Sequence, residues 1–313
     1  MSAATPLRPL TAPKLQLAPA PLSASPEDGI GAYVRATLDA QVRVLLRHQG
    51  EVGDDDNPEA VHQMRVAGRR IRVALRIAGP VLGEEGERVR AEVAWLGGLL
   101  GPVRDLDVLC DRLVNEAADL PEADRPGFIL VLSALRAARV AQATQATTAL
   151  TGRRYRALLR ALAALTQSGA APETGTVADA AELVRRPVRK IRREVKLLGH
   201  NPPDNDLHEL RIRGKRVRYA AEFGAELAGR KAAVKLRILA KAAKQFQDVL
   251  GAHQDTVAAE HRLRELAGQE TLSPGALLVL GRLIERETLE RDRRRAAWWS
   301  AWRTLNEATR PFR

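Results

Sequence analysis

One basic segment occurs twice in this chain, 146 residues apart. The residues from His62 to Arg72 read HQMRVAGRRIR, and those from His208 to Arg218 read HELRIRGKRVR. Five of the eleven positions are identical and four more are conservative exchanges. Self-similarity at a fixed offset is typical of a fold assembled from repeated units. The chain is therefore predicted to contain two matching halves, each of which presents positive charge to a shared anionic partner.

The similarity extends to the segments on either side of this motif. At the same offset of 146, Val42-Arg43 and Arg47 match Val188-Arg189 and Arg193, and at an offset of 150, Leu100-Gly101 and Asp105 match Leu250-Gly251 and Asp255. The change of offset by four residues corresponds to about one inserted helical turn. Two units of this kind usually pack about a pseudo-twofold axis, which would bring equivalent surfaces face to face.

The composition predicts an all-α fold. Ala, Leu, Arg and Glu dominate the chain beyond residue 28, and strand signals are nearly absent. Clusters of Gly, Pro and Asn divide this part into helical segments over 29–50, 58–79, 84–118, 125–167, 177–199, 203–228, 230–267 and 274–309. We therefore predict two four-helix bundles related by internal duplication, the first over 29–168 and the second over 176–310.

The remaining features restrict the class of protein. Residues 1–28 hold six prolines among Ala, Leu and Ser and are predicted to form a disordered tail. Cys110 is the single cysteine, which excludes an internal disulfide and a cysteine-based zinc site and fits a reducing cytoplasm. Because no run of eighteen apolar residues and no signal-peptide core occurs, we expect a cytoplasmic protein with no membrane partner. The acidic loop at 54–56 is interpreted as capping charge, so no metal or cofactor is predicted.

The charge balance points to a polyanionic partner. The net charge is +12 and the isoelectric point is near 10.6. Arginines outnumber lysines by 42 to 8, and a guanidinium binds phosphate oxygens through paired hydrogen bonds. A GC-rich genome would also raise the arginine content, so the pattern of the cations is more informative than their number.

The cations of the first repeated segment fall on one stripe of a helix. At about 100° per residue, Arg65, Arg69, Arg72 and Arg76 lie within roughly 80° of His62. Apolar residues flank this stripe on both sides: Val66, Val73 and Ile77 on one, and Val61, Met64, Ile71 and Leu75 on the other. A cationic stripe between two apolar faces is expected to line a groove or pore between helices. Its length of about 21 Å suits a linear polyanion better than a single phosphate.

The second repeated segment carries a shorter stripe of the same kind. It consists of His208, Arg211, Lys215 and Arg218, flanked by Ile212, Tyr219 and Phe223 on one side and by Leu210 and Val217 on the other. Glu222 stands where the first half has Arg76, and Gln254 stands where it has Arg104. Asp105 and Asp255 are interpreted as residues that orient arginines and not as catalysts.

Other cations have two open interpretations. The pairs Arg43/Arg47 and Arg189/Arg193 precede the two stripes and either extend them or face solvent. The densest basic run, over 185–196, lies just before the second motif, although runs of this kind are often solvated helix faces.

The spacing His-x-x-Arg-x-x-x-Arg/Lys-Arg-x-Arg, present twice, together with Leu-Gly-x-x-Arg-Asp-x-Asp-Val at 100–108, resembles the CHAD family (conserved histidine α-helical domain). The resemblance covers about residues 29–310. It implies two four-helix bundles with pseudo-twofold symmetry around a central basic cavity, which binds inorganic polyphosphate at polyphosphate granules in the cytoplasm. The motif residues that carry over are His62, Arg65, Arg69, Arg72, His208, Arg211, Lys215 and Arg218.

These features are compatible with three functions. The first is polyphosphate binding without catalysis, by His62, Arg65, Arg69, Arg72, Arg76, His208, Arg211, Lys215, Arg218, Arg43, Arg47, Arg189 and Arg193. The alternative is a nucleic-acid-binding helical protein, but aromatic residues make up only 4% of the chain and leave few platforms for base stacking. A phosphohydrolase ranks third, because the sequence has no Walker loop and no metal-binding cluster of carboxylates. The first function extends to other polyanions as partners.

Overall fold

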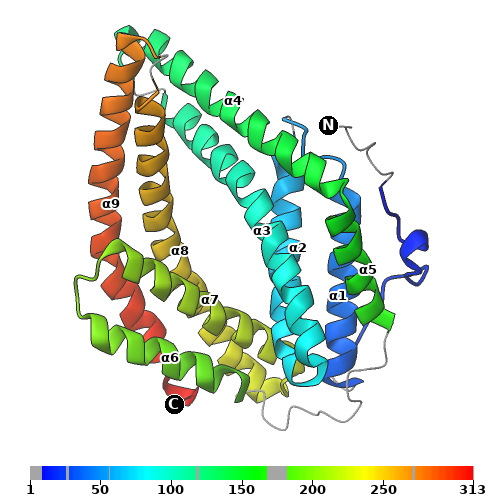
Figure 1. Cartoon of the computed structure of the whole chain (residues 1–313). Helices are drawn as coiled ribbons and strands as arrows, with labels where there is room; N and C mark the ends of the chain where they lie inside the picture. The colour runs from blue at the N-terminus through cyan, green and yellow to red at the C-terminus, as the bar shows by residue number, and fades with distance from the viewer. Residues whose placement is uncertain are drawn as a thin grey trace. The chain divides into compact units, whose positions relative to one another are not determined.

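The computed structural model describes residues 9–25, 28–55, 57–117, 120–167, 182–269 and 272–312. Within these ranges the secondary structure consists of α-helices and short 3-10 helices, with no β-strand, which confirms the all-α prediction (Figure 1). The chain divides into two compact units. Unit 1 comprises Met1–Asp119 and Leu132–Thr176, and unit 2 comprises Leu120–Val131 and Val177–Arg313.

Unit 1 is built from α1 (Gly29–His48), α2 (Pro58–Ile77), α3 (Gly79–Glu116), most of α4 (Arg125–Leu150) and α5 (Arg153–Gln167). Helix α2 packs against both α1 and α3, and α5 packs against α1 and α3. Pro58 occupies the first turn of α2, where its missing N–H costs nothing. The preceding Asn57 makes no capping hydrogen bond, and its Nδ2 donates to Glu51 Oε2 at 3.2 Å.

The prediction of a single helix over 125–167 is wrong. The chain leaves the helical path at Thr151 and Gly152, and α5 starts at Arg153. The N–H of Gly152 donates to the carbonyl of Ala149 at 3.0 Å, which closes the last turn of α4. One glycine in an alanine-rich stretch was therefore sufficient to end a helix, as its low helix propensity allows.

The prediction of a disordered tail is wrong for residues 9–25. Leu10, Leu15 and Leu17 are buried, and Pro13–Leu15 form a 3-10 helix, η1, that packs against α5. The side-chain amide of Gln167 donates to the carbonyls of Leu15 at 3.1 Å and Gln16 at 3.0 Å. The proline-rich composition led us to expect disorder. The free energy gained by burying three leucines offsets the conformational entropy that this segment loses when it becomes ordered. Residues 1–8 and 26–27 of the predicted tail lie outside the described residues.

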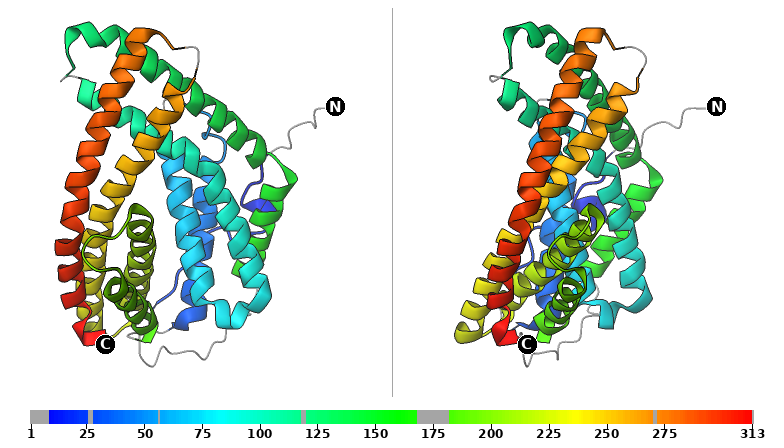
Figure 2. Two further views of the ribbon diagram at one scale, coloured as in Figure 1. Left: turned by 60° about the vertical axis from the view of Figure 1, so that its left-hand side comes forward. Right: turned by 90° about the vertical axis from the view of Figure 1, so that its left-hand side faces the viewer.

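Unit 2 is built from α6 (Glu182–Leu198), α7 (Asp204–Leu227), α8 (Arg230–Ala267) and α9 (Pro274–Ala308), with η4 (Glu122–Asp124) and η5 (Arg310–Phe312). Each of these α-helices packs against the next one in sequence, and η5 packs against α6 and α9. The long helices α8 and α9 run side by side in opposite directions (Figure 1, Figure 2).

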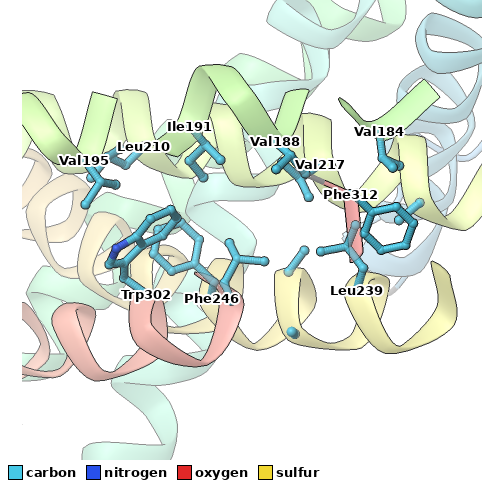
Figure 3. Close-up of a cluster of buried hydrophobic side chains, with 14 of the residues drawn as sticks. Val184, Val188, Ile191, Val195, Leu210, Val217, Leu239, Phe246, Trp302 and Phe312 are labelled. Atoms are coloured by element: carbon cyan, nitrogen blue, oxygen red, sulfur yellow. The ribbon is translucent and has the colours of Figure 1, made fainter. Parts of the chain in front are cut away.

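The core of unit 2 lies where α6 covers the ends of α8 and α9. Val184, Val188, Ile191 and Val195 of α6 point toward Phe246, Trp302 and Phe312 (Figure 3). The ring centroids of Phe246 and Trp302 are 6.0 Å apart in an edge-to-face arrangement that aromatic pairs favour. The valine and isoleucine face of α6 is thus buried in the core. The charged residues of α6 lie on the remaining surface of the helix.

The helix boundaries agree with the sequence-based ones within about two residues for α1, α2, α7, α8 and α9. Helix α3 is bounded by Gly79 and Glu116, but Gly83, with φ of 52°, has a non-helical backbone, so a short helical turn precedes a main helix that starts at residue 84, as predicted. The start of α6 was predicted at 177, but residues 168–181, which also contain the predicted boundary between the repeats, lie outside the described residues.

One helical stretch, Glu122–Leu150, is long and apolar enough to cross a membrane by length and composition alone. The core helices of globular proteins pass the same test. Arg139 within this stretch is buried, and its Nε donates to Asp107 Oδ1 of α3 at 2.9 Å. A buried ion pair with a neighbouring helix indicates that this part of α4 is a packed helix of unit 1.

Candidate functional site

The first cationic stripe lies on α2, beside the buried face of that helix. Val61, Met64, Ile71 and Leu75 are buried, as predicted for one flank of the stripe. The residues of the other flank, Val66, Val73 and Ile77, are only partly buried. The stripe residues also differ in exposure: His62, Arg65 and Arg72 are partly buried, whereas Arg69 and Arg76 are exposed. One flank is therefore core, and the other is accessible.

Arg65 is held against α3. Its Nη1 donates to the carbonyl of Gly97 at 3.5 Å, and its Nη2 lies 4.0 Å from Asp105 Oδ1. A Cβ atom on Gly101 would lie 2.9 Å from Nη1 of Arg65, closer than real Cβ contacts come. Gly101 therefore leaves the space that the guanidinium occupies, and Asp105 stands where an orienting carboxylate was expected.

His62 lies in a strongly positive environment. Its pKa is lowered, first by burial and then by the positive charge of Arg104 on α3, with smaller contributions from Arg69 and Arg65. Glu59 acts in the opposite direction. Burial and the neighbouring arginine charges both favour the neutral imidazole of His62, which can still donate one hydrogen bond. Arg104, which the sequence analysis did not include among the binding residues, thus belongs to the charged surroundings of this stripe.

Arg72 has an unused donor. Its Nε is buried and has no hydrogen-bond partner among the described residues. Buried donors of this kind are uncommon, because an unsatisfied N–H costs about 1–3 kcal/mol. Arg72 thus carries a donor that no described protein group satisfies.

The second stripe, on α7, repeats the contact between an arginine and a glycine. A Cβ atom on Gly251 of α8 would lie 3.6 Å from Nε of Arg211, so this glycine stands beside Arg211 as Gly101 stands beside Arg65. The Nε of Arg211 is buried and also lacks a hydrogen-bond partner in the described part of the chain. The equivalent arginines of the two repeated segments therefore lie beside equivalent glycines of the following helix.

The far end of the second stripe is partly neutralised. The Nε of Arg218 donates to Glu222 Oε1 at 2.6 Å, and its Nη1 lies 3.3 Å from Gln247 Oε1. At the head of the stripe, Nδ1 of His208 lies 2.9 Å from Gln254 Oε1, so this nitrogen donates to the amide oxygen. Glu222 and Gln254 are the two departures from the first repeat, and both now contact a stripe residue.

The four additional cations of the predicted site take different positions. The guanidinium of Arg43 is engaged by Asp39 Oδ2 at 2.9 Å and by the carbonyl of Ala18 at 2.7 Å, so it fastens the N-terminal segment to α1. Arg47 is exposed on α1, and Arg189 and Arg193 are exposed on α6. The structure thus brings the members of each stripe together on one helix and assigns Arg43 a local structural contact.

Two charge clusters, each with a buried member, were not identified from the sequence. In unit 1, Arg139 joins Asp107 of α3 and Asp55 of the acidic loop. In unit 2, Asp204 lies 3.0 Å from Nε2 of His253 and also pairs with Arg295. Burial lowers the pKa of His253, and this effect outweighs the attraction of Asp204. The sequence shows Asp55 and Asp107 as carboxylates, but it does not show that they share Arg139 as a partner. That contact depends on how α4 packs.

A metal site has no support among the described residues. No group of three or more His, Cys, Asp or Glu side chains in that part of the chain is arranged to hold a metal ion. Cys110 is buried, and burial raises the pKa of its thiol.

The comparisons with known proteins agree with one another. The family model of the CHAD domain matches residues 36–264. The crystal structure of the CHAD domain from the plant Ricinus communis superimposes with a TM-score of 0.72 and 25% sequence identity, and the match covers 97% of each chain. The structure of PptA from Streptomyces chartreusis gives a TM-score of 0.67 at 22% identity, over 90% of this chain and 100% of that one.

Curated relatives extend the match. Uncharacterised proteins of Mycobacterium tuberculosis strains CDC 1551 and H37Rv are 31% identical over 291 residues, which is 90% of this chain. The chain spans 54% of the length of these relatives. The family model covers well over half of the chain, in agreement with the resemblance of the duplicated motif. The chain belongs to the CHAD domain family.

Proposed function

We propose that this CHAD domain binds inorganic polyphosphate through the stripe of α2 (His62, Arg65, Arg69, Arg72 and Arg76) and the stripe of α7 (His208, Arg211, Lys215 and Arg218). The observation that carries the proposal is the repeated placement of Arg65 beside Gly101 and of Arg211 beside Gly251. In each unit a guanidinium lies beside a glycine of the following helix, while the rest of the stripe remains partly or fully accessible.

The spacing of the cations supports a linear ligand. Side chains three and four residues apart on a helix are separated by about 5–6 Å at Cβ, and like charges at this distance repel one another. A chain of phosphoryl groups that runs along the helix would meet each cation in turn and remove this repulsion. Guanidinium groups suit this role because they donate two parallel hydrogen bonds to one phosphoryl group.

The unsatisfied donors support an anion as the ligand. The Nε atoms of Arg72 and Arg211 are buried without a partner among the described residues, and the two belong to different stripes. Hydrogen bonds between a charged donor and a phosphate oxygen are among the stronger ones in proteins. A bound phosphate chain toward which these two guanidinium groups turn would therefore recover the free energy that the unliganded protein loses at the two Nε atoms.

The proposal includes the finer points that follow from the resemblance to the family. It assigns a binding role without catalysis and an association with polyphosphate granules in the cytoplasm. The expectation that both stripes line one central cavity, built by two duplicated four-helix bundles, stays a prediction. Arg47, Arg189 and Arg193 remain candidates for the edge of the site.

Titration with polyphosphate tests the proposed function. Isothermal titration calorimetry at physiological salt is expected to give micromolar or tighter affinity that increases with chain length, together with a rise in melting temperature. The affinity is expected to fall steeply with salt concentration, because each neutralised phosphate releases a counterion. Absence of both heat and thermal shift with long-chain polyphosphate would refute the proposal. Competition with duplex DNA separates it from nucleic-acid binding, which predicts preference for DNA.

A further inference from the structure

Helix α7 carries cations on both sides of its buried face. On the side toward α8 lies the stripe, in which His208 contacts Gln254 and Arg218 contacts Gln247. On the side toward α6 lies Arg213, whose Nη2 is 3.7 Å from Glu194 Oε2 of α6. Arg216 follows Arg213 by three residues and therefore shares this second side.

Helix α6 adds two exposed cations to this second side. Arg186 and Lys190 are spaced by four residues and lie on one face of α6. They project away from the valines that point into the core in Figure 3. The pKa of Lys190 is lowered, first by the positive charge of Arg186 and then by burial and the charges of Arg213 and Arg216. Lys190 stands one helical turn before Glu194, which pairs with Arg213 where α6 packs on α7. We name the four residues Arg186, Lys190, Arg213 and Arg216 at this contact the α6–α7 cluster.

The cluster is a property of the second half alone. At the offset of 146 that relates the two basic segments, the corresponding residues of the first half are Ala40, Val44, Ala67 and Arg70. Ala67 is buried, and Ala40 and Val44 are partly buried on α1. Three cations thus stand in unit 2 where unit 1 has small apolar side chains. The repeated stripes are a shared feature of both halves, whereas this concentration of charge is an addition to one of them.

We propose that the α6–α7 cluster is a second phosphate-chain surface of unit 2, separate from the stripe on the other side of α7. It rests on the proposed function for the identity of the ligand, inorganic polyphosphate. All four members are arginine or lysine, so the cluster offers phosphate contacts and no aromatic platform for a base. Glu194 partly offsets the charge of Arg213, so the exposed cations Arg186 and Lys190 of α6 are the main phosphate contacts of the cluster.

A second surface on the same unit makes the protein multivalent toward long chains. An α-helix with its side chains is about 10–12 Å across. A flexible polyphosphate chain bound at the stripe therefore needs only a short unbound stretch to reach the cluster. The second contact then forms at a high effective concentration and raises the affinity for long chains without changing that for short ones.

The test compares two variants that remove the same charge from unit 2. The cluster variant carries Arg186→Gln and Lys190→Gln, both at exposed positions of α6, and the control carries Arg293→Gln and Arg303→Gln, both at exposed positions of α9. Calorimetry is run with long-chain polyphosphate and with a short chain of about ten phosphates, which is matched to the length of one stripe.

For long-chain polyphosphate, the cluster variant is expected to bind about 3–10-fold more weakly than the control, because the tethered second contact is lost. Its salt dependence is expected to flatten, with the magnitude of the log–log slope reduced by about 1.4–1.8 for the two lost phosphate contacts. Short-chain binding is expected to stay within twofold of wild type for both variants. Arg216→Gln, on α7, is expected to reproduce the effect from the other helix of the cluster.

Equal long-chain affinities of the cluster variant and the control would overturn the inference while the proposed function stands. A parallel loss of short-chain and long-chain binding in the cluster variant would also overturn it, because the cluster would then be part of the primary site. If wild type bound neither chain, the proposed function itself would fail and this inference with it. Melting curves of all variants exclude unfolding as the cause.

Discussion

Arg65 and Gly101 depend on each other: a Cβ atom at position 101 would lie 2.9 Å from Nη1 of the arginine. The matching pair in the second unit, Arg211 and Gly251, leaves more room, since a Cβ atom at position 251 would lie 3.6 Å from Nε of Arg211. The first contact is below the range that real Cβ atoms show, whereas the second is an ordinary van der Waals distance. The two units therefore differ in how tightly the glycine constrains the arginine.

Gly101→Ala is expected to displace the Arg65 guanidinium and to weaken polyphosphate binding several-fold. Because alanine has a higher helix propensity than glycine by about 1 kcal/mol, stability is expected to stay level or rise. Gly251→Ala serves as the matched control and is expected to change affinity by less than twofold. Calorimetry and thermal melts of both variants provide the test. Equal losses of affinity in the two variants would contradict the proposed difference between the units.

Glu222 is expected to weaken the second stripe, because its Oε1 accepts a hydrogen bond from Nε of Arg218 at 2.6 Å. Glu222→Gln removes the negative charge and is expected to tighten polyphosphate binding about two- to fivefold, since the pair is largely exposed and such pairs contribute about 0.2–1 kcal/mol. Glu226→Gln, an exposed glutamate one turn further along α7, is the charge-matched control. If both variants gave the same gain, only the general change in net charge would be responsible.

Polyphosphate binding is expected to tighten as the pH falls below 6.5, in part through His62. Burial and the charges of Arg104, Arg69 and Arg65 lower the pKa of His62, so the imidazole is neutral at pH 7. A bound polyanion favours the protonated form, and binding therefore takes up a proton in the acid range. His62→Gln is expected to flatten this part of the pH profile, whereas replacement of the exposed His261 by Gln leaves it unchanged. Identical profiles of His62→Gln and wild type would exclude this role.

The same pKa shift has the opposite sign for the stability of the free protein. Because the pKa of folded His62 lies below that of the unfolded chain, the unfolded state gains protons first as the pH falls through 6.5. Unliganded wild type is therefore expected to lose stability in that window, and His62→Gln is expected to lose less. Denaturant unfolding between pH 7.5 and pH 5.5, with and without polyphosphate, measures both effects on one protein.

Arg139→Ala is expected to destabilise unit 1 by about 3–5 kcal/mol, since it leaves Asp107 as an unpaired buried charge. The two side chains are each 6% exposed, and Nε of Arg139 donates to Asp107 Oδ1 at 2.9 Å. Arg136→Ala, at an exposed position on the same helix, is expected to change the free energy of unfolding by less than about 0.5 kcal/mol. A cost below about 1 kcal/mol for Arg139→Ala would show that water or another group replaces the lost partner.

The helices were predictable because their signals are local. Pro58 marks the start of α2, Pro274 that of α9, and periodic apolar residues mark the buried face between such breaks. The break at Gly152 was missed because a single glycine is weak evidence inside an alanine-rich run. The N-terminal segment was misjudged because its composition describes an isolated chain, whereas Leu15 is buried where η1 packs against α5.

The composition of each stripe was predictable, since all of its members lie on one helix. Their partners were not, because Arg65 contacts Gly97 across 32 positions and Arg43 contacts Ala18 across 25. Such contacts depend on how one segment packs on another. The spacing of charges along a single helix gives no information about that packing. The pairing of Arg218 with Glu222 is the exception, because a separation of four residues is visible in the sequence.

Calorimetric titration of the quadruple variant R65A/R69A/R211A/K215A with long-chain polyphosphate tests the central claim most directly. Two positions come from each stripe, and melting curves establish that the variant is folded. The account predicts a loss of affinity of at least 100-fold at physiological salt and a much flatter salt dependence, because about four phosphate contacts disappear. A folded quadruple variant that binds polyphosphate as tightly as wild type would contradict it.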